Sequence, residues 1–293
     1  MRVNPNPLSD LLSALEQTQQ QINTDSEQVA SGQTVNEPSD NPSAAATLVT
    51  NANQTTEADQ YLRSIGSIQG EMQNADSALS SVVTVLQRAI SLGTEGANGT
   101  NNASDRQAIA TELQGIQSQL VSLANLSYQG NYVFAGTATQ TAPYVVDSNG
   151  SVNYVGNDNT NQIAVGDNLN VAMNLPGSEL FSNAGNDVFQ AIQDLITNLQ
   201  SGTNISGALG EVSNAYDYIN AQRVFYGNAI DQLNTQQTYL NSETTQLAQQ
   251  QNSLSATDLP QAITSLETSQ TAEQATLQII SQTQQANLFS YLK

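Results

Sequence analysis

The strongest pattern in the sequence is a repeat of apolar residues at alternating steps of three and four, which runs from Leu209 to Leu254. Residues at this spacing lie on one side of a helix, so the repeat predicts a long helix that packs against another helix. Similar repeats run from Tyr61 to Leu86 and from Ile109 to Leu123, separated by a turn rich in glycine and asparagine. The second of these follows SDRQ, which predicts a capping box of Ser104 with Gln107. The sequence therefore predicts a mainly α fold, built as a long antiparallel helical bundle.

Both ends of the chain carry the same spacing in a weaker form, because polar residues such as Thr18 and Asp25 interrupt it. A stripe of apolar residues this narrow buries too little surface to stabilise a helix by itself. We therefore expect the two terminal helices to pair as a coiled coil and to complete their folding on assembly. The predicted assembly interface consists of Leu8, Leu11, Leu12, Leu15, Ile22, Val29, Ile263, Leu266, Leu277, Ile280, Leu288, Phe289 and Leu292.

The stretch QVASGQTVNEPSDNPSAAATLV stops the helical pattern near the N-terminus and starts it again. Its Ser-Gly pair fits a helix end, where glycine provides the left-handed cap. Ser39, Asp40 or Asn41 can accept the first free amide protons of the next helix, whose first turn tolerates proline. A second break, SATDLP, lies near the C-terminus. We expect an ordered interdomain joint formed by Gly32, Pro38, Asp40 and Pro42.

A period of two replaces the helical spacing in the middle of the chain. The segment YVVDSNGSVNYV places an Asn-Gly turn between two strand-like runs, which is typical of a β-hairpin. Alternating apolar residues from Ile163 to Leu175 continue this pattern. Three domains are therefore predicted: a terminal coiled coil of residues 1–40 with 258–293, a helical bundle of residues 41–133 with 188–257, and a small β insertion of residues 134–187.

The charge balance restricts the partners of this chain. Its 293 residues include 26 acidic and 6 basic residues, which gives a formal net charge of -20. Such a charge repels nucleic-acid phosphates and anionic lipids, so we expect no nucleic-acid and no membrane partner. The absence of cysteine and histidine excludes disulfides, thiol or imidazole catalysis and soft metal sites. No segment has the apolar run of a signal peptide or a membrane span.

Two sets of polar residues compete with a purely structural role. The first has the spacing of turns rather than that of a calcium loop: Asp147, Asn149, Asp158 and Asn159. The second offers the paired carboxylates that a glycosidase needs: Asp187, Asp194, Glu267 and Glu273. In a chain this acidic, such pairs are typical of a solvated face. We predict no catalytic residue, no metal and no cofactor, with a tailspike-like or wall-degrading enzyme as the enzymatic alternative.

Arg223 occupies a core-register position among apolar neighbours in the longest repeat. Its side chain can extend to solvent or pair with a nearby carboxylate within the bundle. The alternative is a contact with a neighbouring subunit. The sequence leaves both readings open.

Four motifs occur in order along the chain: QVASGQTVNEPSDNPSAAATLV, NLSYQGNYVFAGTATQTAPY, AQRVFYGNAIDQLN and QATLQIISQTQQANLFSYLK. Taken in this order, they resemble motifs of the flagellin superfamily across almost the whole chain. The second, which precedes a short β segment, is similar to the branch of hook-filament junction proteins. Arg223 carries the first arginine of the third motif, whereas Ala229 stands where the family often has a second one.

This resemblance implies paired terminal helices, a helical bundle and a β domain that faces outward. It also implies a ring of copies in the extracellular bacterial flagellum, at the junction of hook and filament. The implied partners are hook-associated protein 1, flagellin, further copies of the chain, a flagellar export chaperone and the type III export apparatus. The alternative within the superfamily is a minor flagellin that forms part of the filament itself. Self-repulsion of so acidic a subunit favours the short ring.

Overall fold

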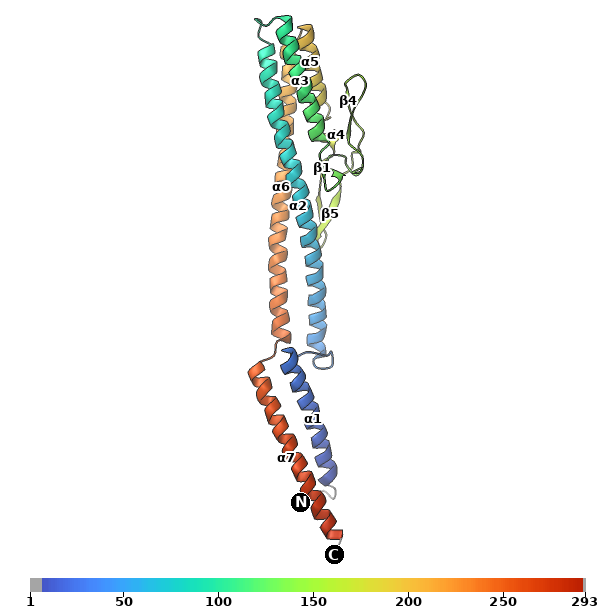
Figure 1. The fold of residues 1–293 in the computed structure, drawn as a ribbon, viewed down its shortest axis with the longest axis vertical. Helices are drawn as coiled ribbons and strands as arrows, with labels where there is room; N and C mark the ends of the chain where they lie inside the picture. Colours follow the sequence, from blue (N-terminus) through green and yellow to red (C-terminus); the bar gives the residue numbers. More distant parts are fainter. Residues whose placement is uncertain (1–6, 292–293) are drawn as a thin grey trace. The chain divides into compact units, whose positions relative to one another are not determined.

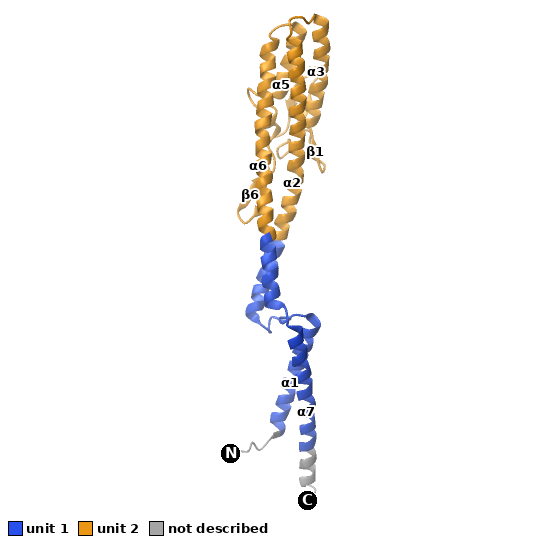
Figure 2. Ribbon diagram, turned by 90° about the vertical axis from the view of Figure 1, so that its left-hand side faces the viewer, with its two compact units in different colours: residues 1–57, 242–293 blue, residues 58–241 orange. Residues whose placement is uncertain are grey.

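The computed structural model describes residues 7–291, and the side chains of residues 8–283. The chain forms two compact units (Figure 2). Unit 1 contains the residues up to 57 and from 242 onward, and unit 2 contains residues 58–241. The three-domain division expected from the sequence stays a prediction. Figure 1 shows a mainly helical fold with a small β region, which confirms the predicted fold class.

Unit 1 is built around the two terminal helices, α1 (Pro7–Ser31) and α7 (Leu259–Tyr291), which lie side by side (Figure 1). The pair is antiparallel, because Gln19 reaches Glu273 while Asp25, further along α1, reaches Ser269, earlier in α7. Unit 1 also contains the first turns of α2 (Pro42–Gly96) and the last turns of α6 (Ile205–Ser255). The sequence-distant ends of the chain therefore fold together.

In unit 2, α2 and α6 run antiparallel, as hydrogen bonds from Gln69 to Asn234 and from Gln87 to Tyr216 show. Helix α3 (Ala103–Ala124) returns along the bundle and packs on α5 (Val188–Ser201). The residues that the predicted repeats place on one side of α2 and α6 are fully buried in this core: Ile65, Ile68, Met72, Leu79, Leu86, Val212, Ile219, Tyr226 and Leu233. The three-four spacing therefore predicted the main core of the protein.

The β region consists of three antiparallel hairpins. They are β1 (Ser127–Tyr128) with β2 (Asn131–Tyr132), β3 (Tyr144–Val146) with β4 (Val152–Tyr154), and β5 (Gln162–Gly166) with β6 (Leu169–Ala172). The hairpin predicted around the Asn-Gly turn is confirmed as β3–β4. Strands begin before residue 134, the expected boundary, because Gln129 and Gly130 take positive φ angles and form the turn of an extra hairpin, β1–β2.

The start of α3 differs from the predicted capping box. Asn102, not Ser104, is the N-cap residue, and its side-chain oxygen accepts the amide protons of Ser104 and Asp105. The Asp105 carboxylate in turn accepts the amide proton of Asn102. The predicted box of Ser104 with Gln107 was wrong by two residues. An asparagine side chain caps a helix as well as serine does, and here Asn102 takes that position with Asp105 as its partner.

Aromatic side chains attach the β region to the helices of unit 2. Phe134, Tyr144, Phe181 and Phe189 form edge-to-face and tilted contacts, with ring centroids 4.9 to 6.2 Å apart. Tyr226 on α6 accepts the amide proton of Leu175 through its hydroxyl oxygen at 3.3 Å. Burial raises the pKa of Tyr226, so its phenol stays neutral in this apolar core. The short helix α4 (Gly177–Leu180) joins this cluster, because the amide of Gly177 donates a hydrogen bond to the backbone carbonyl of Phe134 at 2.7 Å.

Gly136, in the motif YVFAGT, provides a test of this attachment. Its φ is +68°, and an added Cβ atom would overlap the backbone carbonyl of Asn157. We expect Gly136→Ala to lower the free energy of unfolding by about 2 kcal/mol or more, measured by denaturant titration. Gly130→Ala is the control, because Gly130 also has a positive φ (+87°) but no atom within 4 Å of the added Cβ. Equal losses in the two variants would contradict the steric explanation.

Candidate assembly interface

The side of α1 that faces α7 repeats at steps of three and four. Leu8, Leu11, Leu15, Ile22 and Val29 are all half-buried there, and none is fully buried. Asp25 shares this side and is only 3% exposed. Its carboxylate accepts hydrogen bonds from Gln21 at 2.9 Å and from Ser269 at 3.4 Å, and no cation within the described residues pairs with it. The pair therefore buries a charged group where a bundle usually places an apolar one.

The side of α7 toward α1 is even more polar. Ala262 and Ile280 are buried and Leu266 is half-buried, but Ser269 and Glu273 occupy the positions between them. Four large apolar residues of α7 are instead exposed by 43 to 50%: Leu259, Ile263, Leu277 and Ile279. Helix α1 adds Leu12 at 46%. The terminal pair thus buries a carboxylate and leaves several large apolar residues exposed, which gives an isolated pair little stability.

Asn51 extends this polar interior into the part of α2 that belongs to unit 1. It is 4% exposed, and its side-chain nitrogen has no hydrogen-bond partner among the described residues. Its neighbours one heptad away on either side are the small residues Ala44 and Ala58, both buried. An unpaired buried amide costs free energy, so this part of the bundle is held weakly.

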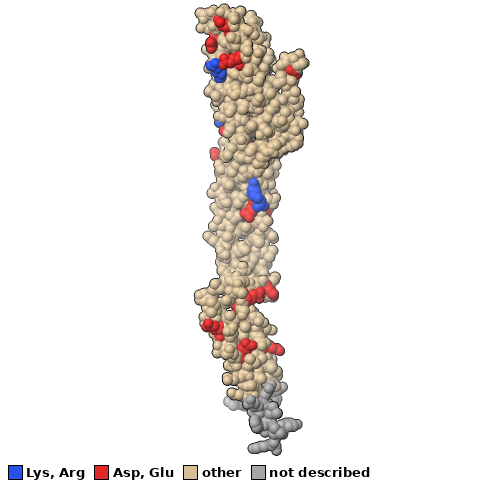
Figure 3. All heavy atoms as spheres, in the orientation of Figure 1, with Lys and Arg blue, Asp and Glu red and all other residues tan. Residues whose placement is uncertain are grey.

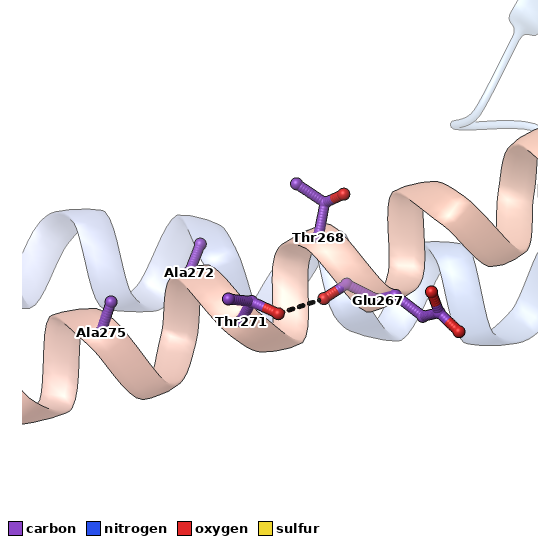
Figure 4. A pocket seen from close by; sticks show the side chains of 5 residues that line it. All are labelled: Glu267, Thr268, Thr271, Ala272 and Ala275. Atoms are coloured by element: carbon purple, nitrogen blue, oxygen red, sulfur yellow. Dashed lines mark hydrogen bonds between the residues drawn. The ribbon is translucent and has the colours of Figure 1, made fainter.

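A shallow hollow of about 480 Å³ follows the outer surface of α7. Figure 4 shows its lining of Glu267, Thr268, Thr271, Ala272 and Ala275, all from this one helix. The Thr271 hydroxyl donates to the backbone carbonyl of Glu267, so it does not project into the hollow as a free donor. The hollow is an open surface depression, lined mostly by small side chains of one helix, and is not an enclosed site.

The structure sorts the predicted interface residues into three groups. Leu8, Leu11, Leu15, Ile22, Val29, Leu266 and Ile280 are brought together, buried or half-buried, in unit 1. Leu12, Ile263 and Leu277 remain exposed. Leu288, Phe289 and Leu292 lie outside the residues whose side chains are described. Leu259 and Ile279 are exposed apolar residues that the sequence pattern missed, since Leu259 lies in the break SATDLP and Ile279 falls outside the three-four register.

The predicted joint is an ordered corner. Gly32 has a φ of +71° and donates its amide proton to Gln28, which closes α1. Two backbone hydrogen bonds then tie this segment to the break before α7: Thr34 donates to Ser255 at 2.7 Å, and Thr257 donates to Gly32 at 3.1 Å. Both partners of this bridge belong to unit 1. The corner therefore lies within a compact unit, and its role as an interdomain joint stays a proposal.

The prolines and polar residues of the corner have distinct positions. Pro38 lies in the tight turn closed by the Asp40 amide and the Glu37 carbonyl. The Asp40 carboxylate accepts the amide protons of Asn36 and Glu37, and these two hydrogen bonds lower its pKa. Asn41 caps α2 by accepting the amide proton of Ala44, and Pro42 is the first residue of that helix. Among the three predicted capping candidates, the structure selects Asn41.

Charged side chains are sparse on the surface around these helices. Figure 3 shows the Asp and Glu residues of the face drawn as separate spots with uncharged surface between them. Within the described residues, two ion pairs occur, Arg88 with Glu112 and Arg223 with Asp76. The described part of the chain also contains no helix apolar enough over a sufficient length to cross a bilayer.

Arg223 pairs within its own chain. Its Nε and Nη2 atoms lie 2.8 and 3.1 Å from the two carboxylate oxygens of Asp76, which is a two-pronged contact between α6 and α2. The hydrogen bond to Asp76 also raises the pKa of Arg223. The intramolecular alternative predicted for this residue is confirmed.

This ion pair allows a double-mutant test. We expect Arg223→Ala and Asp76→Ala, singly and together, to give a coupling free energy of about 0.5 to 1 kcal/mol, because both side chains are partly exposed. The control cycle uses Arg88 and Glu112, whose side chains are 58% and 48% exposed. Coupling there should be smaller, and a larger value would contradict the geometric argument.

Two of the acidic residues considered for catalysis or calcium binding, Asp147 and Asp187, serve as turn and cap groups. Asp147 accepts the amide protons of Asn149 and Ser151 in the β3–β4 turn. Asp187 is the N-cap of α5 and accepts the amide proton of Gln190. Burial raises the pKa of Asp187, and the nearby Asp194 carboxylate adds to this effect. Among the side chains of residues 8–283, no cluster of three or more acidic groups could hold a metal ion.

Comparisons with known proteins point to one superfamily. The bacterial flagellin N-terminal helical region matches residues 5–139. Flagellar hook-associated protein 3 of Escherichia coli strain K12 is 36% identical over 119 residues, or 40% of this chain. The protein of the same name from Salmonella typhimurium strain LT2 is 37% identical over the same share. Each alignment spans 38% of the relative's length.

The fold also matches a solved structure. The flagellar junction protein from Legionella pneumophila superposes with a TM-score of 0.62 at 15% sequence identity. The superposition covers 72% of this chain and 100% of that one. At this identity the likeness concerns the fold alone. The structural match covers much more of the chain than the 40% that is matched in sequence.

Proposed function

Because this chain belongs to the flagellin superfamily, we propose that it is a structural adaptor of the bacterial flagellum, whose copies form a ring that joins the hook to the flagellin filament. Its neighbours in this role are hook-associated protein 1, flagellin and further copies of itself. The chain reaches this place through the flagellar type III apparatus with a dedicated chaperone. The ring lies outside the cell, at the hook-filament junction.

The exposed apolar residues of the terminal pair carry this proposal. Unit 2 fully buries large side chains such as Leu79 and Leu233, whereas α7 leaves Leu277 and Ile279 about half exposed. Apolar surface of this kind on a helix is typical of a protein contact. Since the same helices bury Asp25 and place the half-buried Ser269 beside it, contacts with neighbouring molecules would stabilise these helices more than their contacts with each other do. The predicted interface residues are therefore proposed as subunit contacts.

The proposal assigns no catalytic role to the chain. Asp187 is used as a helix cap, and Glu273 accepts a hydrogen bond from Gln19 across the terminal pair. These carboxylates thus have structural partners at the positions where a glycosidase would need free ones. Hydrolysis of a glycan that one Asp→Asn change abolishes would favour the enzymatic alternative.

Immunolabelling of intact flagella separates the junction role from that of a minor flagellin. An antibody against unit 2 should label one band between hook and filament. Deletion of the gene should leave hooks in place and release flagellin into the medium. Labelling along the filament, with filaments retained in the deletion strain, would instead support the minor flagellin.

A further inference from the structure

The chain has two Asn-Gly pairs, and both lie in exposed turns. Asn98 and Gly99 lie in the turn between α2 and α3, while Asn149 and Gly150 lie in the turn of β3–β4. Asparagine followed by glycine is chemically labile, since no side chain on the second residue blocks attack by its backbone nitrogen on the asparagine amide. Small residues flank both pairs, in Ala-Asn-Gly-Thr and Ser-Asn-Gly-Ser. Their folded surroundings differ.

At Asn98, the turn polarises the side-chain carbonyl and leaves the attacking nitrogen free. The Oδ1 atom accepts two hydrogen bonds from Thr100, at 3.3 Å from its amide and 3.1 Å from its hydroxyl. Gly99 donates its amide proton to no acceptor among the described residues, and no atom lies within 4 Å of where its Cβ would be. Donors aimed at an oxygen that gains negative charge stabilise the transition state.

At Asn149 the arrangement is reversed. Gly150 donates its amide proton to the backbone carbonyl of Asp147 at 3.1 Å, so the attacking nitrogen is engaged. The Asp147 carboxylate holds the turn further by accepting the amide protons of Asn149 and Ser151, both at 2.9 Å. No described group donates to the Asn149 side-chain oxygen. Attack here must first break the turn.

We infer that Asn98 is a self-modification site, at which the folded α2–α3 turn promotes deamidation while the β3–β4 turn protects Asn149. The Gly99 nitrogen loses its proton to water and bonds to Cγ of Asn98. The C–N bond of the side-chain amide then breaks, and ammonia leaves with a proton. Water opens the resulting cyclic imide at either carbonyl, giving aspartate or isoaspartate. The net change consumes one water and releases one ammonia.

The modification alters the turn as well as its charge. Aspartate at position 98 keeps an oxygen that can accept the Thr100 protons, so this product preserves the turn. Isoaspartate adds a methylene group to the main chain, which displaces the carbonyl that now accepts the Asn101 amide proton at 3.0 Å. The α2–α3 turn therefore changes slowly and irreversibly with the age of the molecule.

Mass spectrometry of the full-length protein tests this inference. The folded chain is incubated in mildly alkaline buffer, digested, and examined for the mass change of amide to acid in peptides carrying each pair. Asn98 should convert at least roughly fivefold faster than Asn149. Its side-chain oxygen accepts hydrogen bonds that Asn149 lacks, and the Gly99 nitrogen is not engaged as the Gly150 nitrogen is. In denaturant the two rates should become similar. A faster reaction at Asn149 in the folded chain, or an unchanged ratio in denaturant, would overturn the inference.

Variants of Thr100 test its positioning role. Thr100→Val removes the hydroxyl donor but keeps the shape and the backbone amide, and should slow conversion of Asn98 severalfold. Thr100→Ser keeps the hydroxyl and should restore the rate. Conversion of Asn149 serves as the internal reference in both variants, because it should not change. Equal rates at Asn98 in the valine and serine variants would contradict the role of the hydroxyl.

Discussion

Replacement of Leu233 by aspartate is expected to abolish the cooperative folding of unit 2. Leu233 is fully buried in α6, in the repeat that packs on α2. The change removes its apolar burial and places a carboxylate in the core, at a total cost of about 5 kcal/mol or more. That cost equals much or all of the stability of a typical domain. Circular dichroism should show a large loss of helix or a melting transition shifted to far lower temperature.

The neighbouring residue provides the matched control. Gln232 is exposed on the same helix, so Gln232→Asp adds the same charge without entering the core. Its effect on the free energy of unfolding should stay within about 0.5 kcal/mol. Similar losses in the two variants would mean that charge, and not burial at Leu233, governs the stability of unit 2.

Leu277→Asp should have the opposite profile, with an intact monomer and a failed assembly. Leu277 is 48% exposed on α7, so an aspartate there is solvated in the free chain and changes its stability little. If the proposed contact buries this position between molecules, the unpaired carboxylate costs several kcal/mol, which is a thousandfold or greater loss in affinity. Cells that carry the variant should export it, yet fail to retain filaments and release flagellin into the medium.

Gln278→Asp is the control for this experiment. Gln278 is exposed and adjacent to Leu277, so the added charge is the same while the apolar residue remains. Filaments should persist in this strain. Normal filaments in the Leu277→Asp strain would show that this face of α7 makes no essential contact, and would leave the superfamily assignment untouched.

The sequence predicted the core of unit 2 because the apolar residues of a helix that packs on one side repeat with the period of that helix. Ile219, Tyr226 and Leu233 follow at steps of seven, and all three are fully buried. The hairpin β3–β4 was predicted for a similarly local reason, since an Asn-Gly pair favours the turn that joins two strands. In both cases the residues that form the pattern are close in sequence to the residues whose structure it predicts.

The terminal pair was less predictable, because its contacts depend on the alignment of distant segments. Ile263 and Leu277 are exposed in the single chain, while the polar Ser269 and Glu273 face α1, and their place in the assembly interface stays a prediction. Burial of Asp25 depends on its meeting Ser269, which lies 244 residues away in the sequence. No local pattern determines such an alignment, so apolar spacing alone could not show which of these residues pair within the chain and which remain exposed.

The backbone bridge at the corner of unit 1 joins segments that are far apart in the sequence. Thr34 and Ser255 are 221 residues apart, so joining them directly from an unfolded chain closes a very long loop. The entropy of loop closure grows only logarithmically with length, by about 0.6 kcal/mol for each doubling. Once the antiparallel α2–α6 pair has formed, most of this loop is already closed, and the corner adds little further entropy cost. Segments between α3 and α5 can therefore lengthen or shrink in related chains with little effect on the terminal helices, which leaves the β region free to diverge.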